Sequence, residues 1–298
     1  MAGRILVGIT SWTEPTLIES QRFYPPDVRS AEDRLRYYAS QFPITEVDST
    51  YYALPSEQNS RLWVERTGED FVFDVKAFRL LTQHPTPHKS LPKDIRSGLS
   101  REQQERRSLY LRDLPPPATD EVWSRFESAL LPLDSAGKLG VVLFQFPSWF
   151  FPGRQQQDYI IECTQRLPQY RVAVEFRHHY WLTEKHRDRT MELLKQHGIT
   201  YVCVDEPQGF KSSVPPLVES TTQIGVVRFH GRNKESWQKS GISAAERFNY
   251  LYSEEELQEW GPYVKRLAEK TREVHVLFNN CHQDKAVINA RQARTMFD

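Results

Sequence analysis

The chain alternates between short apolar runs and longer amphipathic stretches from one end to the other. The short runs are rich in Val, Ile and Phe and are bounded by polar or proline-containing segments, which is typical of buried parallel strands. Eight such runs can be counted, and we predict a strand at each of residues 5–10, 44–49, 71–77, 139–146, 171–177, 200–205, 225–230 and 273–279.

Helical patterns fall between these strands. Ser30 and Ser56 are suitable N-caps for two helices, Ser253 opens a capping box with the glutamates that follow it, and Gly198 suits the end of a helix. The predicted helices begin after Ser30 and cover residues 57–63, 121–131, 155–166, 187–197, 254–270 and 283–296.

Strand and helix therefore alternate over residues 1–298, with no compositional break that resembles a linker. This pattern favours one α/β domain, a single (β/α)8 barrel of the TIM type, over two doubly wound halves. No glycine-rich phosphate-binding motif follows any predicted strand, so a Rossmann or P-loop fold is not indicated. Two connections are irregular: a long proline-rich insert after strand three, residues 78–120, and residues 207–223, which lack a clear helix. Both would lie at the C-terminal face, where barrel enzymes build their sites.

The run at residues 171–177 has an unusual polar face. Val172, Val174 and Phe176 share one side of the strand, whereas Glu175 and Arg177 share the other. Because helices cover a barrel from outside, the apolar face should meet the helices and the charged face should point inward. The same reasoning predicts polar side chains at the barrel mouth from the other strands: Trp12, Glu46, Asp48, Lys76, Gln145, Asp205, Arg228, His230, and Asn279 or Asn280.

Bulk composition narrows the classes of function. Lys+Arg and Asp+Glu both total 39, so the net charge does not suggest a dedicated nucleic-acid or membrane binder. The three cysteines are far apart and form no CxxC motif, and the N-terminal apolar run is too short for a signal peptide or a membrane span. A cytoplasmic location with no membrane partner is the expectation. The sequence indicates nothing about the oligomeric state.

The charged inward face has two interpretations. The residues could pair with one another as a structural network, since a lone buried charge costs several kcal/mol, on the order of the penalties measured for unpaired ions. Alternatively they line a polar pocket, in which Glu175, His230 and Asp205 would carry proton transfer. Cations and amides would then hold a small polar or anionic substrate, assisted by carboxylates and aromatic rings. The predicted substrate-binding residues are Trp12, Glu46, Asp48, Tyr51, Lys76, Gln145, Arg177, Arg228, Asn279 and Asn280.

Several segments resemble the YecE-like family, a domain of unknown function related to sugar isomerases. The resemblance implies a TIM barrel and an uncharacterised, sugar-isomerase-related protein, with no settled activity. The matching segments span nearly the whole chain in order: VGITSW at 7–12, FYPP at 23–26, EVDSTYY at 46–52, FDVKA at 73–77, QFP at 145–147, VEFR at 174–177, RFHGR at 228–232 and FNN at 278–280.

The leading hypothesis is an enzyme of isomerase or hydrolase type that acts on a small polar, sugar-like or phosphorylated substrate by acid–base chemistry. The alternatives are a nucleic-acid-binding or endonuclease-like repair barrel, which would use the basic insert and an aromatic rim, and a non-catalytic ligand-binding barrel. No cofactor is predicted. Glu46, Asp48, Glu175, Asp205 and His230 could ligate a divalent metal, but such sites usually gather more histidines than this inward face offers.

Overall fold

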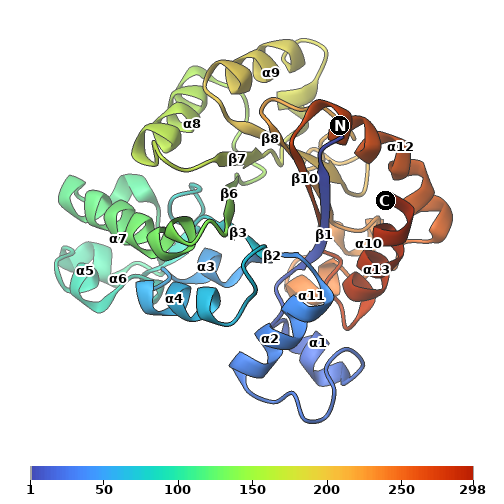
Figure 1. The fold of residues 1–298 in the computed structure, drawn as a ribbon. Coiled ribbons are helices and arrows are strands. Elements are labelled where there is room, and N and C mark those ends of the chain that lie inside the picture. The colour runs from blue at the N-terminus through green and yellow to red at the C-terminus, as the bar shows by residue number, and fades with distance from the viewer. Residues whose placement is uncertain (1, 298) are drawn as a thin grey trace.

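The protein is an α/β barrel of the TIM type, seen in a computed structural model that describes residues 2–297. Eight parallel strands close in the order β1-β10-β9-β8-β7-β6-β3-β2, and helices surround them (Figure 1). Every strand predicted from the sequence is present. The barrel strands are β1 (Arg4–Thr10), β2 (Ile44–Val47), β3 (Val72–Lys76), β6 (Leu139–Gln145), β7 (Val172–Glu175), β8 (Thr200–Asp205), β9 (Ile224–Phe229) and β10 (Glu273–Phe278).

Helices fill most connections between the strands, with caps that their sequences favour. Ser30, Ser56 and Ser253 each accept a backbone N–H of the first turn, and Gly198 has a φ of 64° just after its helix. The helices are α1 (Pro15–Ser20), α2 (Ala31–Gln41), α3 (Ser49–Tyr52), α4 (Glu57–Glu65), α5 (Lys93–Ser97), α6 (Arg101–Glu105), α7 (Pro116–Ser135), α8 (Arg154–Arg166), α9 (Arg187–Gln196), α10 (Lys234–Trp237), α11 (Ala244–Arg247), α12 (Glu254–Lys270) and α13 (Lys285–Phe297).

The insert after β3 is compact. It contains the two-stranded sheet of β4 (Thr86–Pro87) and β5 (Ser108–Leu109), the 3-10 turns η1 (His88–Ser90) and η2 (Leu111–Asp113), and α5 and α6. The insert ends sooner than predicted, because Pro116 and Pro117 start α7 instead of belonging to a loop. A further 3-10 turn, η3 (His179–Leu182), follows β7, and residues 206–223 contain no helix, as predicted.

The register of the strands, with the hydrogen bonds of Arg228 to Glu175 and Glu46 across the barrel, confirms the inward face predicted for β2, β7 and β9. Gln145 is paired with Glu175, and Thr10 with Glu46, so these side chains point to the same side of the sheet. Leu6, Ile44, Val72 and Leu277 form a small apolar cluster of their own within the barrel. The outward residues, such as Val172, Val174 and Phe176, belong to the larger core beneath the helices.

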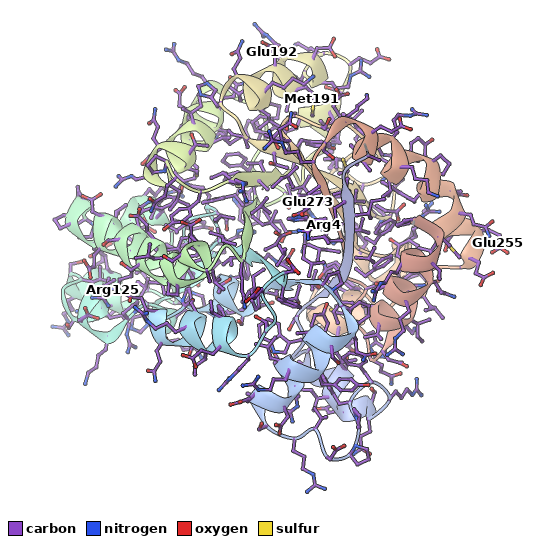
Figure 2. All side chains as sticks on the ribbon, viewed as in Figure 1. Arg4, Arg125, Met191, Glu192, Glu255 and Glu273 are labelled. Atoms are coloured by element: carbon purple, nitrogen blue, oxygen red, sulfur yellow. The ribbon has the colours of Figure 1, made fainter. Side chains whose placement is uncertain are left out.

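A second polar layer lies deeper in the barrel. His275 of β10 contacts the carboxylate of Asp74 through Nδ1 at 2.9 Å and Glu273 through Nε2 at 2.7 Å, and Glu273 accepts a hydrogen bond from Arg4 at 2.9 Å. Figure 2 shows Arg4 and Glu273 side by side near the centre of the view. This layer requires Gly140, because a Cβ there would lie 2.2 Å from Asp74 Oδ1.

Candidate functional site

The mouth of the barrel is organised around Arg228 of β9. Its guanidinium is fully buried and donates through Nη1 to Glu175 Oε2 on β7 and through Nη2 to Glu46 Oε1 on β2, at 2.7 Å for the latter. One cation therefore holds two carboxylates that come from different sides of the barrel. Such a pair of charge-assisted hydrogen bonds offsets the cost of burying all three groups.

Glu175 is the acceptor at which four donors meet. Besides Arg228, it accepts hydrogen bonds from Gln145 Nε2 at 2.7 Å, Arg177 Nη1 at 3.2 Å and His230 Nε2 at 3.0 Å. Burial acts to raise the pKa of Glu175, but the charge of Arg228, the hydrogen bond from His230 and the charge of Arg177 outweigh it and hold that pKa well below the usual value. Glu175 is therefore an ionised carboxylate at neutral pH.

His230 is held at both ring nitrogens. An ionised Glu175 can only accept, so Nε2 carries the proton, and Nδ1 lies 2.9 Å from the amide nitrogen of Asn279. The amide oxygen of Asn279 accepts from the hydroxyl of Thr10 at 2.7 Å, which leaves the amide nitrogen to donate to His230. Burial lowers the pKa of His230 to about 4, so the ring is neutral and fixed in one tautomer.

Glu46 differs from Glu175 in its environment. Its Oε2 atom is buried and accepts no hydrogen bond from residues 2–297. Burial raises the pKa of Glu46 to about 7, although Arg228 and Lys76 oppose this. Two carboxyls that share one guanidinium therefore favour different protonation states near neutral pH.

A partly exposed ion pair lies next to Glu46. Lys76 donates to Asp48 at 2.8 Å, and their side chains keep 10% and 24% of their surface exposed. The ammonium of Lys76 also lies 4.6 Å from the centre of the Tyr51 ring, and Arg79 lies 5.3 Å from the same ring. This part of the mouth keeps limited contact with solvent and carries both signs of charge.

Glu206, which directly follows β8, is a site residue that the sequence did not suggest. Its Oε2 lies 3.0 Å from Arg177 Nη1, and its Oε1 accepts the backbone N–H of Val214 at 2.7 Å. Burial raises the pKa of Glu206 to about 8, despite the nearby charge of Arg177. Arg177 also lies 4.6 Å from the centre of the Trp237 ring. Val202 and Val204 face inward, and continuing this alternation by two residues would have identified Glu206.

The insert adds a histidine to the mouth. Gln83 has a left-handed φ of 64°, and the turn places the His84 ring 5.3 Å from Tyr51 and 5.8 Å from Trp149. Burial, and then the charges of Lys76 and other cations, lower the pKa of His84 to about 3. Trp149 is half exposed and extends this rim outward.

The predicted inward position of Asp205 is wrong. Asp205 is paired with the outward-facing Phe229 of β9, and its carboxylate accepts hydrogen bonds from Tyr252, Trp260 and Arg232. It therefore joins β8 to α12 instead of meeting Glu175 and His230.

Two predicted substrate-binding residues also lie elsewhere. Ser11 has a left-handed φ of 65°, which ends the alternation of β1, so Trp12 packs on Trp63 and Phe73 outside the barrel. It borders a pocket of about 230 Å³ there. Asn280 donates to the carbonyl of Tyr250 and to Asn289, so of the two amides only Asn279 lies with His230.

The other predicted residues are gathered at the mouth by the contacts above, and the paired network predicted as the alternative is present among the innermost of them. Within the described residues, no group of three or more His, Cys, Asp or Glu side chains is arranged to hold a metal ion. The three cysteines are free, and none of the described helices is long and apolar enough to cross a membrane.

The fold and this buried polar mouth define a TIM-type barrel whose charged residues gather at the carboxyl ends of the strands. Residues 6–298 match the model of a family described as "Protein of unknown function DUF72". The chain belongs to the DUF72 family. As the resemblance in the sequence implied, this is a family of unknown function, and the fold is a TIM barrel.

Relatives support the assignment over the full length. The chain is 31% identical to the UPF0759 protein YunF of Bacillus subtilis, over 99% of this chain and 95% of that protein. A crystal structure of a DUF72 family protein from Thermotoga maritima is 31% identical, with a TM-score of 0.76 and 98% of each chain covered. One from Enterococcus faecalis is 25% identical, with a TM-score of 0.79, covering 98% of this chain and 95% of that one.

Proposed function

We propose that the protein is an enzyme that moves protons on a small, polar, sugar-like or anionic substrate at the mouth of the barrel. The strongest support is the pair of carboxyls on Arg228. The pKa of Glu175 is held well below its usual value, whereas that of Glu46 is raised to about 7. Carboxyls whose pKa values are pushed apart in this way commonly divide into an acid and an anion in enzymes.

Glu46 is the proton carrier in this mechanism. Its Oε2 accepts no hydrogen bond from the described chain, whereas the oxygens of Glu175 accept four. A group with a pKa near the working pH is also the better general acid or base. Glu175 and His230, the proton carriers suggested by the sequence, would instead fix the position of Arg228 and thereby the protonation of Glu46.

Substrate binding would fall to the partly exposed residues beside Glu46. Lys76 and Arg177 supply cations for an anionic group or for hydroxyl oxygens, and Asp48 and Gln145 supply acceptors for hydroxyl groups. Because Oε2 of Glu46 is buried, the side chains around it would have to move before a substrate could reach it. The reaction would be of isomerase or hydrolase type, since both need a proton donor and acceptor of this kind.

A thermal-shift screen of sugars, sugar acids and sugar phosphates would test this function, followed by NMR of each stabilising compound to detect conversion. Glu46→Gln should abolish conversion and retain binding, whereas Glu57→Gln, on the exposed face of α4, should change neither. Conversion by Glu46→Gln at the normal rate would refute the role of Glu46. Binding without conversion by the wild type would leave a ligand-binding barrel, and salt-dependent retention on heparin would favour the nucleic-acid alternative.

A further inference from the structure

A groove of about 1130 Å³ runs along the outside of the barrel, next to the mouth. One wall is α8, the other consists of Tyr110–Leu114 of the insert and the first turn of α7, and Gln83 and Trp149 also line the groove. Figure 1 shows α7 and α8 on the same side of the barrel. Pockets for drug-sized ligands measure about 300–1,000 Å³, so this groove has room for a ligand of several rings.

A chain of ring contacts links the groove to the mouth. Trp149 lines the groove and lies 5.8 Å from His84, which lies 5.3 Å from Tyr51 beneath the ammonium of Lys76. The turn between them is anchored to the groove wall, because the Tyr159 hydroxyl of α8 donates to the carbonyl of Leu81 at 2.6 Å. The end of a ligand that lies against Trp149 would therefore be two ring contacts away from Lys76.

The charges of the groove argue against a polyanion. Its lining contains three arginines and three carboxylates. Arg166 pairs with Asp120 at 2.5 Å, Arg154 lies 3.9 Å from Asp158, and Arg112 stacks over the ring of Tyr110 at 4.8 Å. A phosphate backbone needs an excess of cations along its path, whereas the arginines of this groove are matched in number by carboxylates.

The remaining lining residues suit a neutral, hydroxyl-rich chain. Gln83, Gln155 and Gln156 each offer both donors and acceptors, which is what vicinal hydroxyl groups require. Trp149 is 52% exposed at the mouth end and offers a flat apolar face beside these polar groups. A sugar ring has one apolar face and a polar rim, so it can stack on such a tryptophan while its hydroxyls bond to the amides.

We propose that this groove binds the body of a neutral oligosaccharide and presents its terminal unit to the barrel mouth, with Trp149 as the stacking platform between the two. The inference rests on the proposed function, since it assigns the substrate class of the same site. It also makes Trp149 a specificity residue for chain length, because a single sugar unit would fill the mouth and leave the groove empty.

Binding of neutral oligosaccharides to the full-length protein tests the assignment. The probes are the malto-, cello-, manno-, xylo- and N-acetylglucosamine series from one to six units, titrated by calorimetry, with oligothymidylate of six units as the polyanionic comparison. At least one series should bind about tenfold more tightly at six units than at one, corresponding to one additional aromatic contact. Trp149→Ala should abolish that gain, and Phe151→Ala is the matched control, since Phe151 is 53% exposed and does not line the groove.

Each outcome decides the question. Loss of the length dependence in Trp149→Ala, with Phe151→Ala unchanged, supports the groove. No binding by any of the five series, equal loss in both variants, or tighter binding of oligothymidylate than of every sugar overturns it. Glu46→Gln distinguishes this inference from the proposed function, because the variant should keep the length-dependent binding. If binding does not depend on chain length but conversion depends on Glu46, only the assigned ligand class is refuted. If binding depends on chain length and on Trp149 but conversion does not depend on Glu46, only the role of Glu46 as the proton carrier is refuted.

Discussion

Arg228 donates to Glu46 across 2.7 Å, from β9 to β2, with both side chains fully buried. The same guanidinium holds Glu175 of β7, so a single cation compensates two carboxylates inside the barrel. Removing one partner of a buried ion pair leaves the other charge without compensation, which costs far more than the intact pair contributes.

Arg228→Met should therefore lower the free energy of unfolding by about 3–5 kcal/mol, the cost typical of breaking a buried ion pair. Urea denaturation at pH 7 measures it. Arg101→Ala is the control, because Arg101 and Glu105 form an exposed pair whose loss should cost at most about 1 kcal/mol. Adding Glu175→Gln to Arg228→Met should recover part of the loss, since Glu175 is the ionised partner of Arg228 and its stranded charge is removed; additive effects of the two substitutions would contradict the coupling.

The lower polar layer should give the protein a stability that depends on pH above neutrality. Burial acts to lower the pKa of His275, but Asp74 and Glu273 outweigh it and raise that pKa to about 9. The native state therefore holds this proton more tightly than the unfolded chain. The resulting stability is complete below pH ~6.5, the ordinary histidine value, and is lost as the pH rises through about 9.

The difference in unfolding free energy between the wild type and His275→Gln should thus shrink by about 3 kcal/mol between pH 6 and pH 10, as a shift of this size implies. Urea denaturation at half-unit pH steps measures it. Subtracting the unfolding free energy of the variant from that of the wild type at each pH removes the contributions of other titrating groups. Parallel curves for the two proteins would show that His275 carries no bound proton in the native state.

Side-chain alternation predicted most of the barrel and much of the mouth, because helices cover the outer face and force polar residues inward. This reasoning failed where both faces of a strand are apolar, so that the inward face could not be recognised. Val202 and Val204 face the interior of the barrel, so the charged residue that ends β8, Asp205, was assigned to the interior and Glu206 was not identified. His275 shares the parity of Asn279 and was open to the same reasoning, but it lies in the lower layer instead of the mouth.

Other features depended on backbone conformation, which alternation does not encode. The left-handed φ at Ser11 turns Trp12 out of the barrel, and that at Gln83 turns His84 towards the mouth. Serine and glutamine only occasionally adopt that conformation, so neither residue marks a reversal in the sequence. The pairing of Arg228 with both Glu46 and Glu175 likewise depends on how strands distant in sequence meet. The alternation of side chains showed only that cations and carboxylates share the inward face, not which of them pair.

Gly140 should tolerate no side chain, although it lies in the middle of β6. A Cβ would lie 2.2 Å from Asp74 Oδ1 and 2.8 Å from His275 Cε1, so Gly140→Ala must displace the lower polar layer. We expect a loss of about 1–3 kcal/mol in unfolding free energy, as for other overpacked cores, and a smaller pH dependence of the kind attributed to His275. Gly68→Ala is the control, since a Cβ there meets nothing within 4 Å. Equal stability of the two variants would show that Asp74 and His275 can move apart freely.

The tautomer of His230 should be fixed by Asn279. Nε2–H donates to Glu175, and Nδ1 accepts from the Asn279 amide, so the ring is neutral with a pKa of about 4. Asn279→Asp would replace the donor by a carboxylate, which favours a proton on Nδ1 and a doubly protonated ring. We expect the pKa of His230 to rise above the ordinary value, whereas Asn279→Leu should leave the ring neutral. Long-range ¹⁵N–¹H NMR of the histidine rings from pH 4 to pH 8 reports both nitrogens directly. A His230 that titrates near pH 6.5 in the wild type, or that is unaffected by Asn279→Asp, would contradict this arrangement.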